Sequence, residues 1–397
     1  MALQVVSQRK RGFICVNAHP EGCRRNVEQQ IASVVRSIPR RDGLHNVLVI
    51  GASTGYGLAS RIAAAWGFGA KTLGVFFERP PKEGATATAG YYNTVAFHEF
   101  ARRDGLTTFS LNGDAFSDGI KQQALEKIRK EMGPLDLVIY SLASPRRIHP
   151  RTGQIFDSAL KPIGESFSSK SIDLKHEQVI HVTLEPAVEK EITDTIAVMG
   201  GEDWLMWMEA LAGQQLLAPG ARTLAYSYIG PQVTWPIYRD GTIGRAKKDL
   251  EETSRHLDRM LRENFGGSAR ISVNKAVVTQ ASSAIPVVPL YLSILPPVMQ
   301  KLGTDEMPVD QMIRLFRDFL AANDTTLLDE EGRVRLDALE LRPEVQSGVA
   351  HTWVQVTSEN LLDLTDFPGF KRAFDNLFGF DIEGVDYSQP VETDLCW

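Results

Sequence analysis

At 397 residues the chain is long enough to bury a large core, and its 43% hydrophobic and 23% charged residues are typical of globular proteins. A net charge of −6 argues against general nucleic-acid binding, so we expect no nucleic-acid partner. The three cysteines, Cys15, Cys23 and Cys396, are too few for a disulfide framework and favour a reducing, cytoplasmic compartment.

Neither a metal site nor a membrane span is predicted. Cys15, His19 and Cys23 supply only three candidate ligands and lack the tight spacing of zinc clusters. The longest apolar stretch, residues 284–299, is shorter than the ~20 residues that a membrane helix needs. Prolines also interrupt this stretch, so we interpret it as a buried or ligand-covering segment.

From residue 46 onward, short apolar runs alternate with helical patterns. The spacing predicts strands at 46–51, 71–78, 107–114 and 135–143, separated by helices at 56–66, 94–105 and 117–132. Such alternation is typical of βαβ units whose parallel sheet is covered on both faces. Because the crossovers are right-handed, the expected fold is α/β: a doubly wound parallel sheet of the Rossmann type.

The alternation stops at residue 144 and resumes at about residue 202. We interpret residues 144–201 as an insertion, since it contains four prolines and a strand-like run at 179–184. The pattern then predicts helices at 204–217, 242–265, 290–302 and 309–320, with strands at 222–230 and 269–279. The acidic extension 321–397 suggests a hairpin near 333–356 and a helix around 370–378. We expect a single elaborated domain with N-terminal, mid-chain and C-terminal additions around a core of 46–143 and 202–320.

A glycine-rich turn follows the first predicted strand. Glycine permits a tight turn and lets the backbone approach a pyrophosphate, while the next helix presents free N–H groups to that anion. The spacing is G-x3-G-x-G, and its place between a strand and a helix strengthens the prediction of a dinucleotide site. The expected contacts are Gly51, Ala52, Ser53, Thr54, Gly55 and Tyr56.

Residues at the ends of the next strands complete this predicted site, because ligands bind at the carboxyl edge of such sheets. Glu78 can accept hydrogen bonds from ribose hydroxyls and repel a 2′-phosphate, which favours NADH, although Arg79 acts in the opposite direction. Further cofactor contacts are predicted at Phe77, Asp114, Ala115, Leu142 and Ala143.

Tyr238 and Lys247 are the predicted catalytic pair. A nearby ammonium stabilises developing phenolate character, so a tyrosine beside a lysine can donate a proton or stabilise an oxyanion. Short-chain dehydrogenases space the two as Tyr-x3-Lys, but here the spacing is Tyr-x8-Lys. On one continuous helix that spacing would put them on opposite faces, so Tyr238 must lie outside the helix, on a loop flanked by Pro236 and Gly241.

Helical periodicity selects the lysine. Ile243, Ala246 and Leu250 mark the buried stripe, which points Lys247 inward and leaves Lys248 at the surface. Tyr228, at the end of the fifth predicted strand, is a candidate second phenol at the substrate carbonyl. Tyr226 remains the alternative, and Tyr228 is favoured only because it is nearer the strand end.

Together these motifs resemble the FabV-type trans-2-enoyl-CoA reductases, a family related to the short-chain dehydrogenase/reductases. The resemblance spans nearly the whole chain. It rests on GFICVNAHPEGC, GASTGYGLASRIAAAWGFGA, GVFFERPP, YSLASPRR, LAYSYIGP, the Tyr-x8-Lys pair and KAVVTQASSAIPVVPLY.

The resemblance implies an elaborated Rossmann-type enzyme, usually monomeric, that uses NADH to reduce the carbon–carbon double bond of an enoyl-CoA or enoyl-acyl-carrier-protein thioester in fatty acid biosynthesis. It implies that Tyr238 donates a proton or stabilises an enolate, that Lys247 holds the cofactor and that Tyr228 contacts the thioester carbonyl. Glu78 would select NADH, and residues 285–299 would cover the acyl chain. The nicotinamide end would be lined by Val277, Val278 and Thr279.

Two alternatives remain open from the residues alone. A carbonyl reductase of the short-chain type would show Tyr-x3-Lys with an upstream serine, so the observed spacing counts against it. A non-catalytic NAD-sensing protein would have no need for both Tyr238 and an inward Lys247.

Overall fold

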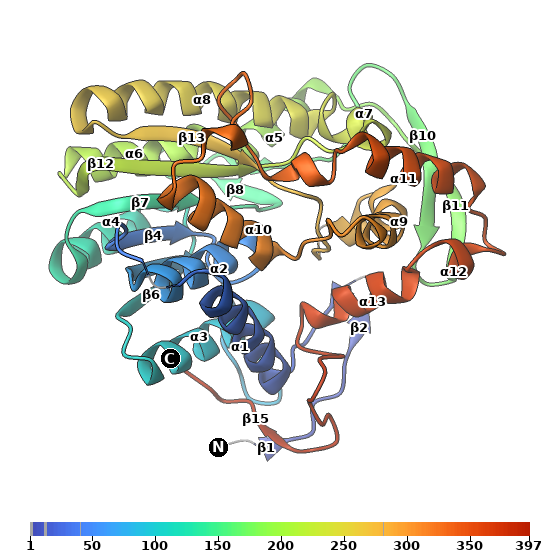
Figure 1. The fold of residues 1–397 in the computed structure, drawn as a ribbon, viewed down its shortest axis with the longest axis horizontal. Helices are drawn as coiled ribbons and strands as arrows, with labels where there is room; N and C mark the ends of the chain where they lie inside the picture. The colour runs from blue at the N-terminus through green and yellow to red at the C-terminus, as the bar shows by residue number, and fades with distance from the viewer. Residues whose placement is uncertain (1–2, 12–13, 40, 281) are drawn as a thin grey trace.

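A seven-stranded parallel sheet forms the centre of the computed structural model, which describes residues 3–11, 14–39, 41–280 and 282–397. The strand order is β14-β13-β12-β7-β4-β5-β6, so the chain runs outward in one direction from β4 and then back across it from β7 (Figure 1). This is the predicted doubly wound fold, with its switch point between β4 and β7. The strands are β4 (Asn46–Ile50), β5 (Lys71–Phe76), β6 (Thr108–Asn112), β7 (Leu135–Tyr140), β12 (Leu217–Ser227), β13 (Ser268–Val273) and β14 (Val334–Arg335).

Helices cover both faces of the sheet, which is why its central strands are almost continuously apolar. Along β4, Val47 and Val49 face one helical layer, while Leu48 and Ile50 face the other. Figure 1 shows the two layers on opposite sides. The first contains α1 (Pro20–Ser37), α2 (Gly55–Ile62), α3 (Ala89–Arg103) and α10 (Pro308–Arg314); the second contains α4 (Asp118–Lys127), α6 (Glu202–Gly213) and α8 (Thr242–Phe265), with α5 (Glu189–Met199) packed on α8.

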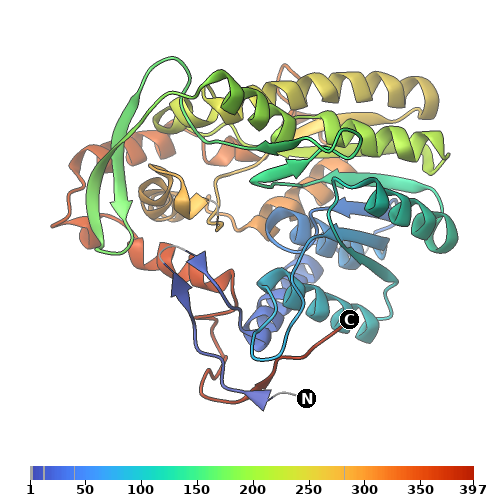
Figure 2. The same ribbon diagram turned by 180° about the vertical axis from the view of Figure 1, so that it is seen from behind.

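A third group of elements lies beyond the carboxyl edge of β12 and β13. It has its own apolar core, which includes Tyr291, Leu295 and Val345. Figure 2 shows its β-hairpin lying beside α9. The group contains α7 (Trp235–Tyr238), α9 (Val288–Lys301), α11 (Pro343–Gln355), α12 (Leu361–Leu364), α13 (Phe367–Asn376) and the hairpin of β10 (Phe167–Asp173) and β11 (Gln178–Leu184).

Short elements complete the structure. The N-terminal strand β1 pairs with the C-terminal strand β15, so the two ends of the described chain lie together. The short strands are β1 (Leu3–Gln4), β2 (Lys10–Arg11), β3 (Ile14–Cys15), β8 (Arg146–Ile148), β9 (Ile155–Asp157) and β15 (Val391–Glu392). The π-helical segments are η1 (Ala63–Gly67), η2 (Ile128–Met132) and η5 (Leu315–Ala321). The 3-10 helices are η3 (Gln232–Thr234), η4 (Ser282–Ala284), η6 (Thr325–Leu327) and η7 (Leu336–Leu339).

The hairpin predicted at 333–356 is wrong. Val334 pairs in parallel with Ser272 and so extends the main sheet by one strand, and residues 343–355 form α11. Pro343 stands in the first turn of that helix, where its missing N–H costs nothing. Val345 and Val349 are both buried at helical spacing, a signal that the strand prediction overlooked.

Several helix and strand boundaries in the structure also differ from the predicted ones. The sixth strand leaves the sheet after Val273 instead of running to residue 279, and β12 begins at Leu217, where a helix was expected to end. The insertion contains α5, a helix that the sequence reading did not predict. Within the described ranges, no helix combines the length and the apolar character needed to cross a bilayer.

A buried ion pair stabilises the turn after β6. Lys121 Nζ lies 2.7 Å from Asp203 Oδ1, and it also donates to the carbonyl oxygens of Ala115 and Phe116 at 3.0 and 2.9 Å. Removing one member leaves the other charge buried without its partner. We expect Lys121→Met to lower the free energy of unfolding by about 3 kcal/mol, measured by urea denaturation. The exposed Lys130→Met is the control, and equal stability of the two variants would contradict this.

Candidate active site

The glycine-rich turn has the geometry of an anion cradle. Gly51 adopts φ 86°, and a Cβ at this position would lie 2.3 Å from the carbonyl oxygen of Ser141 at the end of β7. Thr54 is the N-cap of α2 but makes no side-chain hydrogen bond to it, so the first N–H groups of this helix remain available. Thr54 and Gly55 are exposed there, whereas Ala52 and Ser53 are buried beneath them. The turn therefore fits a diphosphate.

Glu78 is joined directly to this turn. Ser53 Oγ donates to Glu78 Oε1 at 2.7 Å, so the carboxylate lies at the edge of the cradle, where a dinucleotide places a ribose. The neighbouring Gly90 leaves no room for a side chain, since a Cβ there would meet the same oxygen at 2.0 Å. Phe77 is 78% exposed and offers an apolar surface beside Glu78, at the edge of the glycine-rich turn.

We expect Glu78 to control the choice of dinucleotide. Glu78→Ala should raise the ratio of kcat/KM for NADPH over NADH by about tenfold or more, since removing even ~1.4 kcal/mol of charge repulsion has that effect. The measurement is NADH and NADPH oxidation under identical conditions. The exposed Glu83→Ala serves as the matched control, and a Glu78→Ala ratio equal to that of the control would contradict the assignment.

The remaining strand-end residues lie at two places along the edge. Asp114 caps the turn after β6, accepting the Phe116 N–H at 3.0 Å, and Leu142 and Ala143 follow β7 beside Gly51. Ala115 is 3% exposed and its carbonyl accepts bonds from Lys121 and Trp207. The backbone of Ala115 therefore also supports this turn.

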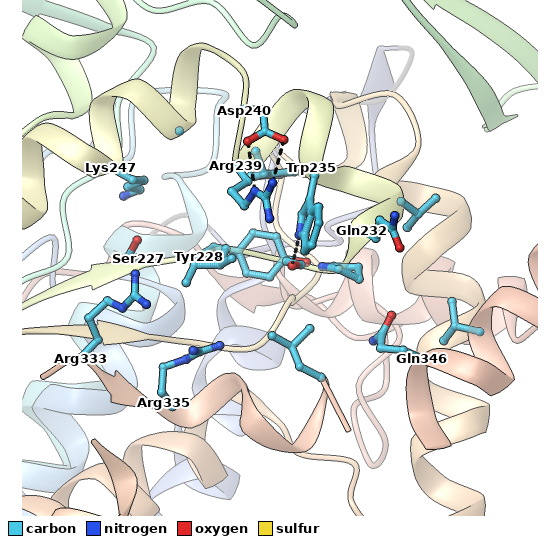
Figure 3. A pocket seen from close by; sticks show the side chains of 18 of the residues that line it. Ser227, Tyr228, Gln232, Trp235, Arg239, Asp240, Lys247, Arg333, Arg335 and Gln346 are labelled. Atoms are coloured by element: carbon cyan, nitrogen blue, oxygen red, sulfur yellow. Dashed lines mark hydrogen bonds and ion pairs between the residues drawn. The ribbon is translucent and has the colours of Figure 1, made fainter. Parts of the chain in front are cut away.

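A cavity of about 1040 Å³ opens beside the ends of β12 and α8. Figure 3 shows Tyr228 in its middle, with Lys247 reaching in from α8 and Gln346 from α11. Arg333 and Arg335 form another wall, but carboxylates already pair with them: Glu251 with Arg333 at 3.2 Å and Asp337 with Arg335 at 2.8 Å. The volume suits a small-molecule substrate.

Tyr238 and Tyr228 share this cavity. Their rings meet edge to face, with centroids 4.9 Å apart and planes at 90°. Tyr238 lies outside α8, as predicted, but it ends the short helix α7 instead of lying on an open loop. Burial raises the pKa of both phenols above their usual value, which keeps them protonated and able to donate at neutral pH.

Lys247 reaches the same cavity from the second turn of α8. Its Nζ donates to the carbonyl oxygen of Tyr226 at 3.2 Å, which leaves two further N–H donors. The predicted orientation is confirmed, since Lys247 is half-buried and Lys248 is exposed. Burial lowers the pKa of Lys247 to about 8, because desolvation disfavours the ammonium.

Tyr226 and Tyr56 have structural partners elsewhere. The Tyr226 hydroxyl meets Ser60 and Met312 between α2 and α10. Tyr56 donates to the carbonyl oxygen of Lys275 at 2.7 Å and accepts from Gln311 at 2.8 Å. Tyr56 therefore fixes α2 to the segment after β13, which continues into the half-buried Val277, Val278 and Thr279.

Glu340 is the residue that the sequence analysis missed. It follows η7 in the C-terminal extension and is fully buried, yet its Oε1 lies within hydrogen-bond distance, 3.2 Å, of the Tyr228 hydroxyl. Tyr291 of α9 donates to the same oxygen at 2.6 Å. The apolar neighbours Leu339 and Leu341 were the only signal in the sequence that this carboxylate is internal.

Comparison with known proteins agrees with this geometry. Three family models match the chain in succession: an NAD(P)H binding domain of trans-2-enoyl-CoA reductase over residues 5–83, a trans-2-enoyl-CoA reductase catalytic region over 85–321, and an enoyl reductase FAD binding domain over 328–391. The chain belongs to the trans-2-enoyl-CoA reductase family.

Individual relatives match this chain over almost their whole length. The chain is 54% identical to an NADH-dependent enoyl-[acyl-carrier-protein] reductase of Opitutus terrae and 53% identical to one of Yersinia pestis, in each case over 98% of both chains. The crystal structure of Treponema denticola trans-2-enoyl-CoA reductase in complex with NAD superposes with a TM-score of 0.94 at 44% identity, covering 99% of this chain and 98% of that one.

The description of the third family model names FAD, but residues 328–391 do not fit a flavin dinucleotide. Proteins hold such a diphosphate with a glycine-rich turn and a free helix N-terminus. Here α11 has Glu344 in its first turn, and the Asp366 carboxylate caps α13 by accepting the Gly369 N–H at 2.9 Å. Carboxylates therefore stand where a diphosphate would need N–H donors. The turn at Gly51 fits a nicotinamide dinucleotide instead.

Proposed function

We propose that this member of the family uses NADH to reduce the carbon–carbon double bond of trans-2-enoyl thioesters, the last reductive step of a fatty acid elongation cycle. The observation that carries the proposal is the shared cavity of Tyr228, Tyr238 and Lys247 at the carboxyl end of β12. Two phenols and an ammonium converge there, which suits a reaction whose charge develops on one oxygen.

NADH, when bound, supplies hydride to the β-carbon, and the thioester oxygen then carries enolate charge. Tyr238 hydrogen-bonds this oxygen, and Tyr228 contributes a second donor from the adjacent wall. Each phenol is held by its neighbour's ring, so neither must reorganise as the charge develops. Loss of one such preorganised donor typically costs about 10²–10³ in rate.

Lys247 acts from α8. Its ammonium raises the positive potential at the phenols and holds the cofactor ribose, while the Tyr226 carbonyl fixes its direction. The proposed cofactor contacts are the turn at Gly51–Tyr56, Phe77, Glu78, Asp114, Ala115, Leu142 and Ala143, with Val277, Val278 and Thr279 at the nicotinamide end. Supporting this arrangement, the Gly51 turn and the residues after β13 are joined through Tyr56.

Residues 285–299, which include most of the apolar helix α9, would cover the acyl chain, since Leu292 and Leu295 belong to the same apolar core as Tyr238. The names of the relatives include both carriers, acyl carrier protein and CoA, and the two present the same thioester.

We further propose that the enzyme acts as a monomer in the cytoplasm. We also propose that its additions form one elaborated domain, because β14 extends the main sheet and β15 pairs with β1.

One assay tests this activity. NADH oxidation is followed with crotonyl-CoA and, separately, with acetoacetyl-CoA. We expect turnover of the enoyl substrate only. Turnover of the ketone alone would indicate a carbonyl reductase, and turnover of neither would favour an NAD-sensing protein.

A further inference from the structure

Glu340 is a fully buried carboxyl group that touches the proposed active site through Tyr228. Its Oε2 accepts the backbone N–H of Ala276 at 2.8 Å, just beyond the end of β13. Its Oε1 lies 2.6 Å from the hydroxyl of Tyr291 and 3.2 Å from that of Tyr228. The two oxygens are therefore not equivalent, since one meets an N–H group and the other meets two hydroxyls.

Gln346 of α11 sets the direction of the hydrogen bonds in this cluster. Its Nε2 donates to the backbone oxygen of Glu340 at 2.8 Å and to the hydroxyl oxygen of Tyr291 at 3.2 Å. An amide NH2 can only donate, so Tyr291 is an acceptor at that contact. The single O–H of Tyr291 is then free to donate to Glu340 Oε1, as its shorter distance indicates.

An ionised Glu340 would disable Tyr228. A carboxylate is an acceptor only, so it would draw the one phenolic proton of Tyr228 toward itself. Tyr228 would then present only lone pairs to the cavity that it lines. Lone pairs repel an enolate oxygen, so Tyr228 could not act as the second donor.

The surroundings of Glu340 favour its neutral form. Its carboxyl is 0% exposed, and burial raises its pKa because desolvation penalises the charge. The titratable and charged groups that face it are the phenols of Tyr228, Tyr291 and Tyr56, the cation Lys275 and the carboxylate Asp337. Lys275 is paired with Asp305 at 3.0 Å and Asp337 with Arg335 at 2.8 Å, so Glu340 has no cation of its own among them.

We propose that Glu340 is a positioning residue that remains protonated and donates its own hydrogen bond to Tyr228, which turns the Tyr228 proton toward the thioester oxygen. The hydrogen bonds then run in one direction, from Gln346 through Tyr291, Glu340 and Tyr228 to the substrate. Each hydroxyl donates once and no covalent bond changes. This inference rests on the proposed function only in naming the final acceptor.

Infrared spectroscopy tests the protonation state without any turnover. The difference spectrum of wild-type protein minus Glu340→Gln, recorded at neutral pH in the presence of NADH, should contain the C=O stretching band of a protonated carboxylic acid. A carboxylate band in its place would overturn the inference, whether or not the protein reduces enoyl thioesters. Failure of the proposed function would be recognised separately, as absent turnover of crotonyl-CoA by the wild type.

Kinetics test the role. Glutamine can donate to Tyr228 but cannot ionise, so Glu340→Gln should keep kcat for crotonyl-CoA within about tenfold of the wild type. Glu340→Met can neither donate nor accept, and its kcat should fall by about 10², at unchanged NADH affinity. Equal losses in the two variants would overturn the inference. If Glu340→Met does not fold, a Glu340→Gln kcat reduced by 10² would do the same.

Asp194→Asn is the matched control. Asp194 is likewise buried, is paired with Lys190 of the same helix, and is not among the groups that face Glu340. Its replacement should lower thermal stability but leave kcat per folded molecule and the infrared band of Glu340 in place. Loss of that band in Asp194→Asn would show that the band responds to a buried carboxylate elsewhere, which contradicts a specific role for Glu340.

Discussion

Tyr238→Phe should reduce kcat for crotonyl-CoA by about 10²–10³, because the variant lacks the hydroxyl that we propose donates to the developing enolate charge. NADH affinity and thermal stability should remain near wild-type values, since the ring still packs edge to face on Tyr228. The measurements are steady-state kinetics and a fluorescence titration with NADH.

Tyr226→Phe is the control for this variant. The Tyr226 hydroxyl lies on the other side of β12, between Ser60 and Met312, so its loss should cost about 1 kcal/mol of stability and little kcat. A fully active Tyr238→Phe enzyme would remove Tyr238 from the mechanism. A greater loss of kcat in Tyr226→Phe than in Tyr238→Phe would contradict the assignment of Tyr238 as the principal hydrogen-bond donor.

Gly51→Ala should weaken NADH binding by about 10² or more. The residue has φ 86°, which costs an L-residue about 1–2 kcal/mol, and the added Cβ would lie 2.3 Å from the Ser141 carbonyl oxygen. The backbone must shift to relieve this contact, and that shift moves the N–H groups of the cradle. The measurement is the dissociation constant for NADH, with circular dichroism to confirm folding.

Gly55→Ala separates strain from steric conflict. Gly55 also has a positive φ, 52°, but a Cβ there has no other atom within 4 Å. Its loss of NADH affinity should therefore stay at about tenfold or less, which corresponds to the strain alone. An equal or larger loss at Gly55 than at Gly51 would contradict the close-approach explanation.

The sequence predicted the central strands of the sheet well, because β4, β5 and β7 are buried on both faces and the turn after each is marked by glycine or a polar residue. Helix geometry alone predicted that Tyr238 lies outside α8 and that Lys247 points inward. The structure confirms both positions. The Tyr-x8-Lys spacing counted against a carbonyl reductase, and the resemblance then indicated the carbon–carbon double bond of an enoyl thioester as the group that is reduced.

The structure of the C-terminal extension was predicted wrongly from the sequence for a physical reason. Val334 and Arg335 form only a two-residue strand, and its neighbour Ser272 lies far away in the chain, so no local pattern reveals the pairing. Glu340 depends on that pairing, because β14 and η7 carry it beneath Tyr228. A buried carboxylate held by two distant tyrosines leaves almost no local signature.

The most direct test of the account follows the transferred hydrogen. The enzyme reduces crotonyl-CoA with NADH deuterated at the transferred position of the nicotinamide, in ordinary water, and the butyryl-CoA product is examined by NMR. Hydride addition to the β-carbon followed by protonation of an enolate predicts deuterium at C3 and a solvent-derived proton at C2. Deuterium at C2, or a product without deuterium, would contradict it.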